Sequence, residues 1–165
     1  MLQGLIDRFS KRVWLALFAL VPAGLVATGL VMESVYRLNP CPLCIFQRVL
    51  YLAISGLGLV GLLLPRISRL WAGLIAPIAL GGLATAGYQS WMQAFPHTVT
   101  ECSYTNPNLI ERFVDWLGMQ WPAMFMATGF CSSRDWEFLG LSFANWSALA
   151  FAGFATLAIL LLRRK

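Results

Sequence analysis

The four cysteines of this 165-residue chain are the residues best suited to redox chemistry by type and spacing. Cys41 and Cys44 form a Cys-x-x-Cys pair, whereas Cys102 and Cys131 lie far downstream. A disulfide between Cys41 and Cys44 would close a very short loop, worth only about 2 kcal/mol in the chain-entropy model. The pair is therefore a poor structural staple and is better suited to reversible thiol–disulfide exchange.

The position of the first pair favours a reactive thiolate. Pro40 and Pro42 interrupt any preceding helix and set up a new one, because proline is accepted in a first helical turn. The free amides and dipole of that turn favour the thiolate form of Cys44. Arg48 follows four residues later on the same helix face, where its guanidinium would stabilise the thiolate and bind an oxygen-bearing ligand. The alternative for Arg48 is an interfacial arginine that reaches the lipid headgroups.

The second pair leaves more readings open. A bond between Cys102 and Cys131 would close a long loop and add about 3.6 kcal/mol, so a purely structural disulfide is an alternative. Four cysteines allow three pairings, which the sequence does not distinguish. A zinc site is disfavoured because 28 residues separate the second pair. We therefore predict no metal site, and we interpret His97 as an exposed loop residue outside the site.

The composition predicts that these cysteines belong to a membrane protein. Hydrophobic residues make up 59% of the chain and charged residues only 12%, whereas soluble domains carry about 25% charged residues. Long windows contain no charge at all, namely residues 13–32, 49–65, 70–100 and 138–162. A bilayer core needs about 20 helical residues. Each window is long enough to cross it, once the second is extended back through Ile45.

The chain is therefore predicted to be a single all-α membrane domain, residues 1–165, built as a bundle of four helices. The predicted spans cover about residues 13–32, 45–64, 70–90 and 145–162, and a short loop (33–44) and a long loop (91–144) lie on one side. The first span is too long for the 7–15 apolar residues of a signal peptide. In the long loop, apolar residues between 109 and 117 recur at helical spacing. This pattern predicts a short amphipathic helix, either on the membrane surface or packed on the outer face of the protein.

The charge distribution predicts the orientation. The net charge is +5, but eight of the twelve basic residues fall on one side of the membrane if the spans alternate. The positive-inside rule then places both termini in the cytoplasm and all four cysteines on the opposite side. The positive charge is explained by topology, so we predict no nucleic-acid partner. The eight residues are Arg8, Lys11, Arg12, Arg66, Arg69, Arg163, Arg164 and Lys165.

Nearly the whole chain resembles the disulfide bond formation protein B (DsbB) family. The resemblance rests on the four spans, on the motif Cys-Pro-Leu-Cys-Ile-Phe-Gln-Arg at residues 41–48, on the cysteines at 102 and 131, and on residues 134–141. It implies a quinone-dependent thiol/disulfide oxidoreductase of the bacterial inner membrane that reoxidises a DsbA-like periplasmic thiol oxidase. The cysteines would then face the periplasm, where disulfides persist.

The resemblance also implies a role for each site residue. Cys102 and Cys131 would face the protein substrate, with Cys102 attacked by reduced DsbA. Cys131 would pass electrons to Cys41 through an interloop disulfide. Cys44 would react with the quinone, either ubiquinone or menaquinone, and Arg48 would bind it. An acidic residue is also familiar at the position of Gln47, which leaves the polarity beside Arg48 open.

Two other classes of protein share some of these features. An enzyme of the vitamin K epoxide reductase type also combines four helices with Cys-x-x-Cys, but there the active pair follows the loop cysteines along the chain. A non-catalytic membrane scaffold with two structural disulfides would not require Arg48, which could be replaced by lysine or alanine without consequence. Within the main interpretation, a paralogue that serves a dedicated oxidase stays open.

Overall fold

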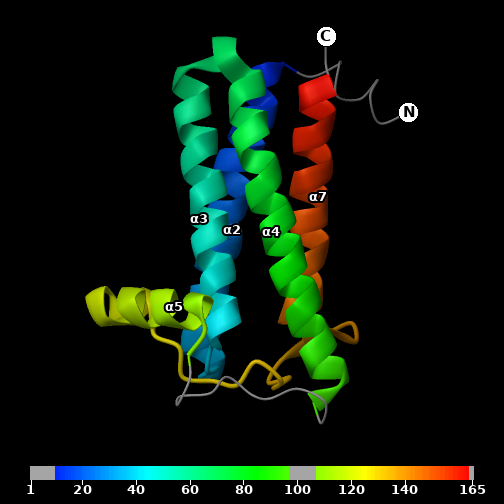
Figure 1. Cartoon of the computed structure of the whole chain (residues 1–165). Helices are drawn as coiled ribbons and strands as arrows, with labels where there is room; N and C mark the ends of the chain where they lie inside the picture. Colours follow the sequence, from blue (N-terminus) through cyan, green and yellow to red (C-terminus); the bar gives the residue numbers. More distant parts are fainter. Residues whose placement is uncertain (1–9, 97–106, 164–165) are drawn as a thin grey trace.

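The computed structural model describes residues 10–96 and 107–163, so Cys102 and His97 lie outside the described residues. Four long helices run side by side in Figure 1, and each is long and apolar enough to cross a membrane. They are α2 (Lys11–Tyr36), α3 (Pro42–Leu63), α4 (Ser68–Ala94) and α7 (Phe143–Arg163). The predicted all-α, four-helix membrane fold is confirmed.

The helices end at caps and prolines, and α2, α4 and α7 extend past both ends of the predicted spans. Helix α2 continues through Glu33 and stops where Arg37 takes a left-handed conformation (φ 51°). Helix α3 begins directly at Pro42, and the 3₁₀ turn η1 (Pro65–Ile67) joins it to α4. Helix α4 extends four residues past the predicted span and ends at Ala94. Polar side chains at a membrane boundary do not stop a helix, so the predicted spans underestimate helix length.

Small residues allow the helices to approach closely, as is usual where lipid supplies no hydrophobic driving force. A Cβ atom on Gly58 of α3 would lie 2.5 Å from the backbone nitrogen of Ala19 in α2. Beside it, the hydroxyl of Ser55 donates a 2.6 Å hydrogen bond to the Ala19 carbonyl. On the other side of the bundle, a Cβ atom on Gly82 of α4 would lie 2.3 Å from the ring of Phe151 in α7.

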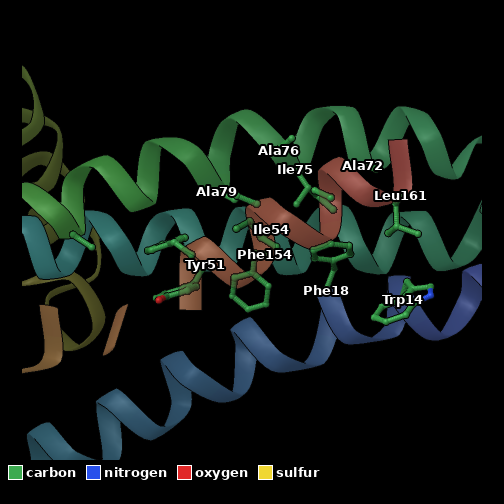
Figure 2. Close-up of a cluster of buried hydrophobic side chains, with 14 of the residues drawn as sticks. Trp14, Phe18, Tyr51, Ile54, Ala72, Ile75, Ala76, Ala79, Phe154 and Leu161 are labelled. Carbon is green, nitrogen blue, oxygen red and sulfur yellow. The ribbon is translucent and has the colours of Figure 1, made fainter. Parts of the chain in front are cut away.

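Aromatic rings fill the centre between the four helices. The ring of Phe151 stacks on Tyr51 of α3 with centroids 4.2 Å apart. Phe154 of α7 packs against both Tyr51 and Phe18 of α2, each at 6.2 Å. Figure 2 shows Phe18, Tyr51 and Phe154 between the ribbons, with the alanines of α4 on the far side. This cluster connects α2 to α7 through ring contacts.

The segment between α4 and α7 contains more structure than the sequence predicted. It holds α5 (Leu109–Gln120), α6 (Pro122–Phe125) and a two-stranded antiparallel hairpin of β1 (Glu137–Phe138) and β2 (Leu141–Ser142). The hairpin turn uses positive φ values at Leu139 (54°) and Gly140 (74°), as tight two-residue turns require. No strand was predicted, because two-residue strands carry too short an alternation to be recognised.

Helix α5 lies crosswise beside one end of the bundle (Figure 1). A capping box starts it, since the side chains of Asn108 and Glu111 each bond to the other's backbone N–H. Val114 and Leu117 are buried against Ile45 of α3, so this amphipathic helix does pack on the protein itself. Its opposite side exposes Leu109, Phe113, Trp116 and Met119. Contact of that side with a membrane surface stays a prediction.

Candidate functional site

Cys41 and Cys44 lie together at the start of α3. Cys41 is the N-cap residue, and its sulfur accepts a hydrogen bond from the Cys44 backbone N–H at 3.3 Å. The two Sγ atoms are 3.0 Å apart, and the Cys41 thiol donates to the Cys44 sulfur. Pro42 occupies the first helical position, where its missing N–H costs nothing. The local sequence therefore holds the dithiol in a geometry suited to disulfide formation.

Cys131 lies against this pair although it is 90 residues away from Cys41 in the chain. Its side chain is hydrogen-bonded with that of Cys41, and both are buried in a small cluster with Leu43 and Met92. The chain just before Cys131 is held to the short loop, because the amides of Thr128 and Gly129 donate to the Pro40 carbonyl at 2.9 and 3.0 Å.

The segment after Cys131 is held by α4. The amide nitrogen of Gln93 donates to the Ser133 carbonyl at 2.9 Å. The hydroxyl of Ser142 donates to the amide oxygen of Gln93 at 2.6 Å. Gln93 thus connects α4, the Cys131 segment and β2, and it holds the chain just after Cys131.

The surroundings of Cys41 favour its protonated form. Burial is the main cause that raises the pKa of the Cys41 thiol well above its ordinary value, and hydrogen bonds with Cys131 and Cys44 act in the same direction. A thiol that keeps its proton can donate to a neighbouring sulfur, as the contact with Cys44 requires. The two cysteines of the pair are therefore not equivalent.

Two buried glutamines complete the surroundings of the pair. Gln89 of α4 donates from its amide nitrogen to the sulfurs of Cys44 and Cys41, at 3.0 and 3.3 Å. The amide oxygen of Gln89 accepts a 2.8 Å hydrogen bond from Gln47 of α3. Gln89 does not stand out from the sequence pattern as a site residue. The available signal was a polar residue at the end of a predicted apolar span, which is expensive in a membrane and typical of a functional site.

Arg48 contacts α2 and the chain beside α6, and its predicted effect on the Cys44 thiolate stays a prediction. Its guanidinium forms an ion pair with Glu33 of α2 and donates to the Met124 carbonyl at 2.8 Å. Arg48 thus joins α2, α3 and the chain beside α6. Within the described residues, the side-chain donor to the Cys44 sulfur from another helix is Gln89. The predicted role of Arg48 in quinone binding stays a prediction.

A cavity of about 710 Å³ lies directly beside these residues. Its polar lining includes Cys44, Arg48, Gln47 and Gln89, and most of the remaining wall is apolar. The apolar wall comes mainly from α2 and α7, with Leu25, Val26, Met32, Trp146, Leu149 and Ala150. An apolar cavity with a few convergent polar groups is the usual form of a small-molecule site. In the described part of the chain, no group of three or more residues is arranged to hold a metal ion.

A multi-pass bundle with a Cys-x-x-Cys pair at the start of one helix and a third cysteine beside it is the arrangement expected of a membrane thiol/disulfide oxidoreductase. The family model described as "Disulfide bond formation protein DsbB" matches residues 11–161, and the chain belongs to this family.

Similar proteins carry the name of this family. Disulfide bond formation protein B of Dechloromonas aromatica is 56% identical over 159 residues, which is 96% of each chain. The protein of that name from Aromatoleum aromaticum is 41% identical and covers 95% of each chain. The one from Photorhabdus laumondii is 33% identical over 93% of this chain and 89% of its own. Disulfide bond formation is therefore the process in which this chain takes part.

Proposed function

We propose that the chain reoxidises a DsbA-like periplasmic thiol oxidase and passes the electrons to a quinone in the bacterial inner membrane. The observation that carries the proposal is the contact of Cys131 with Cys41, beside a cavity that also exposes Cys44. In this arrangement Cys131 can exchange electrons directly with Cys41, and the Cys44 sulfur lines the cavity in which a lipid-soluble acceptor would bind.

The proposed relay consists of thiol–disulfide exchanges. A thiolate of the reduced partner attacks Cys102 of a Cys102–Cys131 disulfide, which releases the Cys131 thiolate. Cys131 then attacks Cys41 of a Cys41–Cys44 disulfide, so that a Cys41–Cys131 bond forms and Cys44 leaves as a thiolate. The second thiol of the partner resolves its bond with Cys102 and leaves the partner oxidised. Cys102 then attacks Cys131 in the Cys41–Cys131 bond, which restores the Cys102–Cys131 disulfide and frees Cys41 with Cys44 as the reduced pair. Each exchange breaks one sulfur–sulfur bond and forms another.

The residues around the cavity fit a quinone. Its apolar wall suits a ring with an isoprenoid tail, and the donors on Arg48, Gln47 and Gln89 suit the ring oxygens. When bound, the quinone supplies an acceptor of two electrons and two protons. It is oxidising enough to reoxidise a partner whose reduction potential is about −120 mV. The chain's own contribution is to hold the Cys44 sulfur at the cavity wall and to keep water away from it.

The orientation forms part of the same proposal. Lys11, Arg66 and Arg163 lie at helix ends or turns opposite the cysteine end of the bundle. The positive-inside rule then puts that end in the cytoplasm and the cysteines in the periplasm. A soluble thiol oxidase of that compartment would meet the segment between α4 and α7.

The test is quinone reduction by the purified chain in detergent, driven by reduced DsbA, with ubiquinone-1 and menadione as alternative acceptors. Cys44→Ser should abolish turnover, because the Cys41–Cys44 disulfide can then no longer form. Arg48→Ala should raise the KM for quinone more than it lowers kcat. Inert wild-type protein with intact disulfides would overturn the proposal.

Glu33→Gln is the matched control for Arg48→Ala. It removes the ion pair with α2 but keeps the guanidinium at the cavity. If Arg48 binds the quinone, Glu33→Gln should leave the KM close to that of the wild type. An equal rise in KM for both variants would show that Arg48 acts only by joining α2 to α3.

A further inference from the structure

Gln47 and Gln89 form a buried amide pair in the middle of the site. Their side chains are 4% and 2% exposed, although each is placed on a membrane-spanning helix. Burying an amide is unfavourable unless its hydrogen bonds are satisfied. The 2.8 Å bond from the Gln47 nitrogen to the Gln89 oxygen satisfies one group on each. The rest of the Gln89 amide is directed at sulfur atoms.

The bond from Gln47 determines which way the Gln89 amide faces. A glutamine amide has an acceptor side and a donor side. Because Gln47 donates to the oxygen of Gln89, the nitrogen of Gln89 must face the other way. There it donates to Cys44 at 3.0 Å and to Cys41 at 3.3 Å. Gln47 is thus a positioning residue that acts through Gln89.

A donor beside these sulfurs favours one redox state of the pair. Hydrogen bonds to a charged acceptor are stronger than those to a neutral one. The Gln89 amide therefore stabilises a thiolate at Cys44 more than it stabilises the disulfide. Stabilising the reduced form of a dithiol makes its disulfide more oxidising. The amide itself carries no titratable proton in the physiological range, so it acts only as a hydrogen-bond donor.

We propose that Gln89, oriented by Gln47, sets the redox equilibrium of the Cys41–Cys44 pair by donating hydrogen bonds to its reduced form. The inference deepens the proposed function, since it concerns the pair that would face the quinone. In that relay, a more oxidising Cys41–Cys44 disulfide accepts electrons from Cys131 more readily.

The experiment measures this equilibrium without quinone turnover or a protein partner. In full-length protein carrying Cys102→Ser and Cys131→Ser, the remaining pair is equilibrated with a series of reduced-to-oxidised glutathione ratios. The reaction converts one protein disulfide and two glutathione thiols into two protein thiols and one glutathione disulfide. The reduced fraction is counted by mass spectrometry after acid quenching and maleimide trapping.

Gln89→Leu should lower the equilibrium constant for reduction about tenfold, which corresponds to about 30 mV for a two-electron couple. Gln47→Leu should shift the equilibrium in the same direction by less, because the Gln89 amide remains but is free to rotate. Ser90→Ala is the control. It changes the polar residue next to Gln89 on α4, whose hydroxyl bonds to the Ala86 carbonyl and not to the pair.

A Gln89→Leu protein that unfolds at the parent temperature but keeps the parent equilibrium within twofold would overturn the proposal. A shift with Gln89→Leu and none with Gln47→Leu would overturn the orienting role of Gln47. If either single variant fails to fold, the double Gln47→Leu, Gln89→Leu variant leaves no unpaired amide and takes its place, since exchanging both partners for apolar groups is far less costly. The assay needs no quinone, so failure here is distinct from failure of the electron-transfer test.

Discussion

At the scale of single residues, the three described cysteines differ in their access to solvent. Cys41 and Cys131 are 2% and 0% exposed, whereas Cys44 is partly exposed and lines the cavity. Cys41 is also the N-cap of α3 and the donor in its contact with Cys44. A residue in that position should remain a thiol in the reduced, folded protein.

The raised pKa of Cys41 predicts a pH dependence of stability. Because the folded-state pKa lies above the unfolded value, the thiol contributes stability that is fully present below about pH 8.5. This contribution is lost as the pH rises toward the folded-state pKa. We expect the thermal unfolding temperature of the reduced protein in detergent to fall between pH 7.5 and pH 10. The fall should be smaller in Cys41→Ala, and equal falls in both proteins would contradict the assignment.

The cysteine motif with its prolines was sufficient to predict a helix start beside the pair and the proximity of Cys41 to Cys44, although α3 begins at Pro42 and not at the predicted Ile45. Both features depend on neighbours within one helical turn. The bond of Gln89 to the sulfurs could not be predicted in this way, because it depends on how α4 is rotated against α3. The ion pair of Arg48 with Glu33 likewise depends on the packing of α2 on α3. Sequence spacing indicates which residues share a helix face, but not which helix that face meets.

At the scale of elements, the Cys131 segment is held in place by a close contact with the short loop. A Cβ atom on Gly129 would lie 2.1 Å from the Asn39 carbonyl oxygen. Backbone atoms cannot yield as a flexible side chain can, so only glycine fits there. The amide of Gly129 also donates to Pro40 from the same position. Gly129 therefore determines how closely Cys131 approaches Cys41.

Gly129→Ala should slow formation of the Cys41–Cys131 disulfide several-fold, because the added methyl group pushes the segment away from the loop. The measurement uses Cys44→Ser, Cys102→Ser protein, in which only these two cysteines remain. Oxidation is started with copper phenanthroline and followed by maleimide trapping. Gly153→Ala is the control, since a Cβ atom at Gly153 meets nothing within 4 Å. An unchanged rate in Gly129→Ala would show that the segment shifts without moving Cys131.

At the scale of the whole molecule, the bundle depends on one aromatic stack between close-packed helices. Phe151 fits against Gly82 on one side and stacks on Tyr51 on the other. The Tyr51 hydroxyl forms a 2.8 Å hydrogen bond with that of Ser147, and both residues line the cavity. Packing between α4 and α7 is thereby coupled to the shape of the cavity wall.

Gly82→Ala should destabilise the bundle by about 1–3 kcal/mol, the usual cost of overpacking a filled core. Its neighbour Gly81 provides a matched control, because a Cβ atom there meets nothing within 4 Å. In detergent, the thermal unfolding temperature of Gly82→Ala should be lower than that of Gly81→Ala and that of the parent. Equal unfolding temperatures would mean that the Phe151 ring moves aside without loss.

The burial of Cys131 affects whether small thiols can reduce a disulfide formed at this residue. While its segment is held by Pro40 and Gln93, Cys131 and Cys41 are both buried, and Cys44 is the partly exposed sulfur of the three. A disulfide joining these two sulfurs would be insulated from reduction by stray thiols such as glutathione. In the proposed relay, oxidising equivalents from the quinone would then reach a docked protein partner and would not be consumed by small thiols in solution.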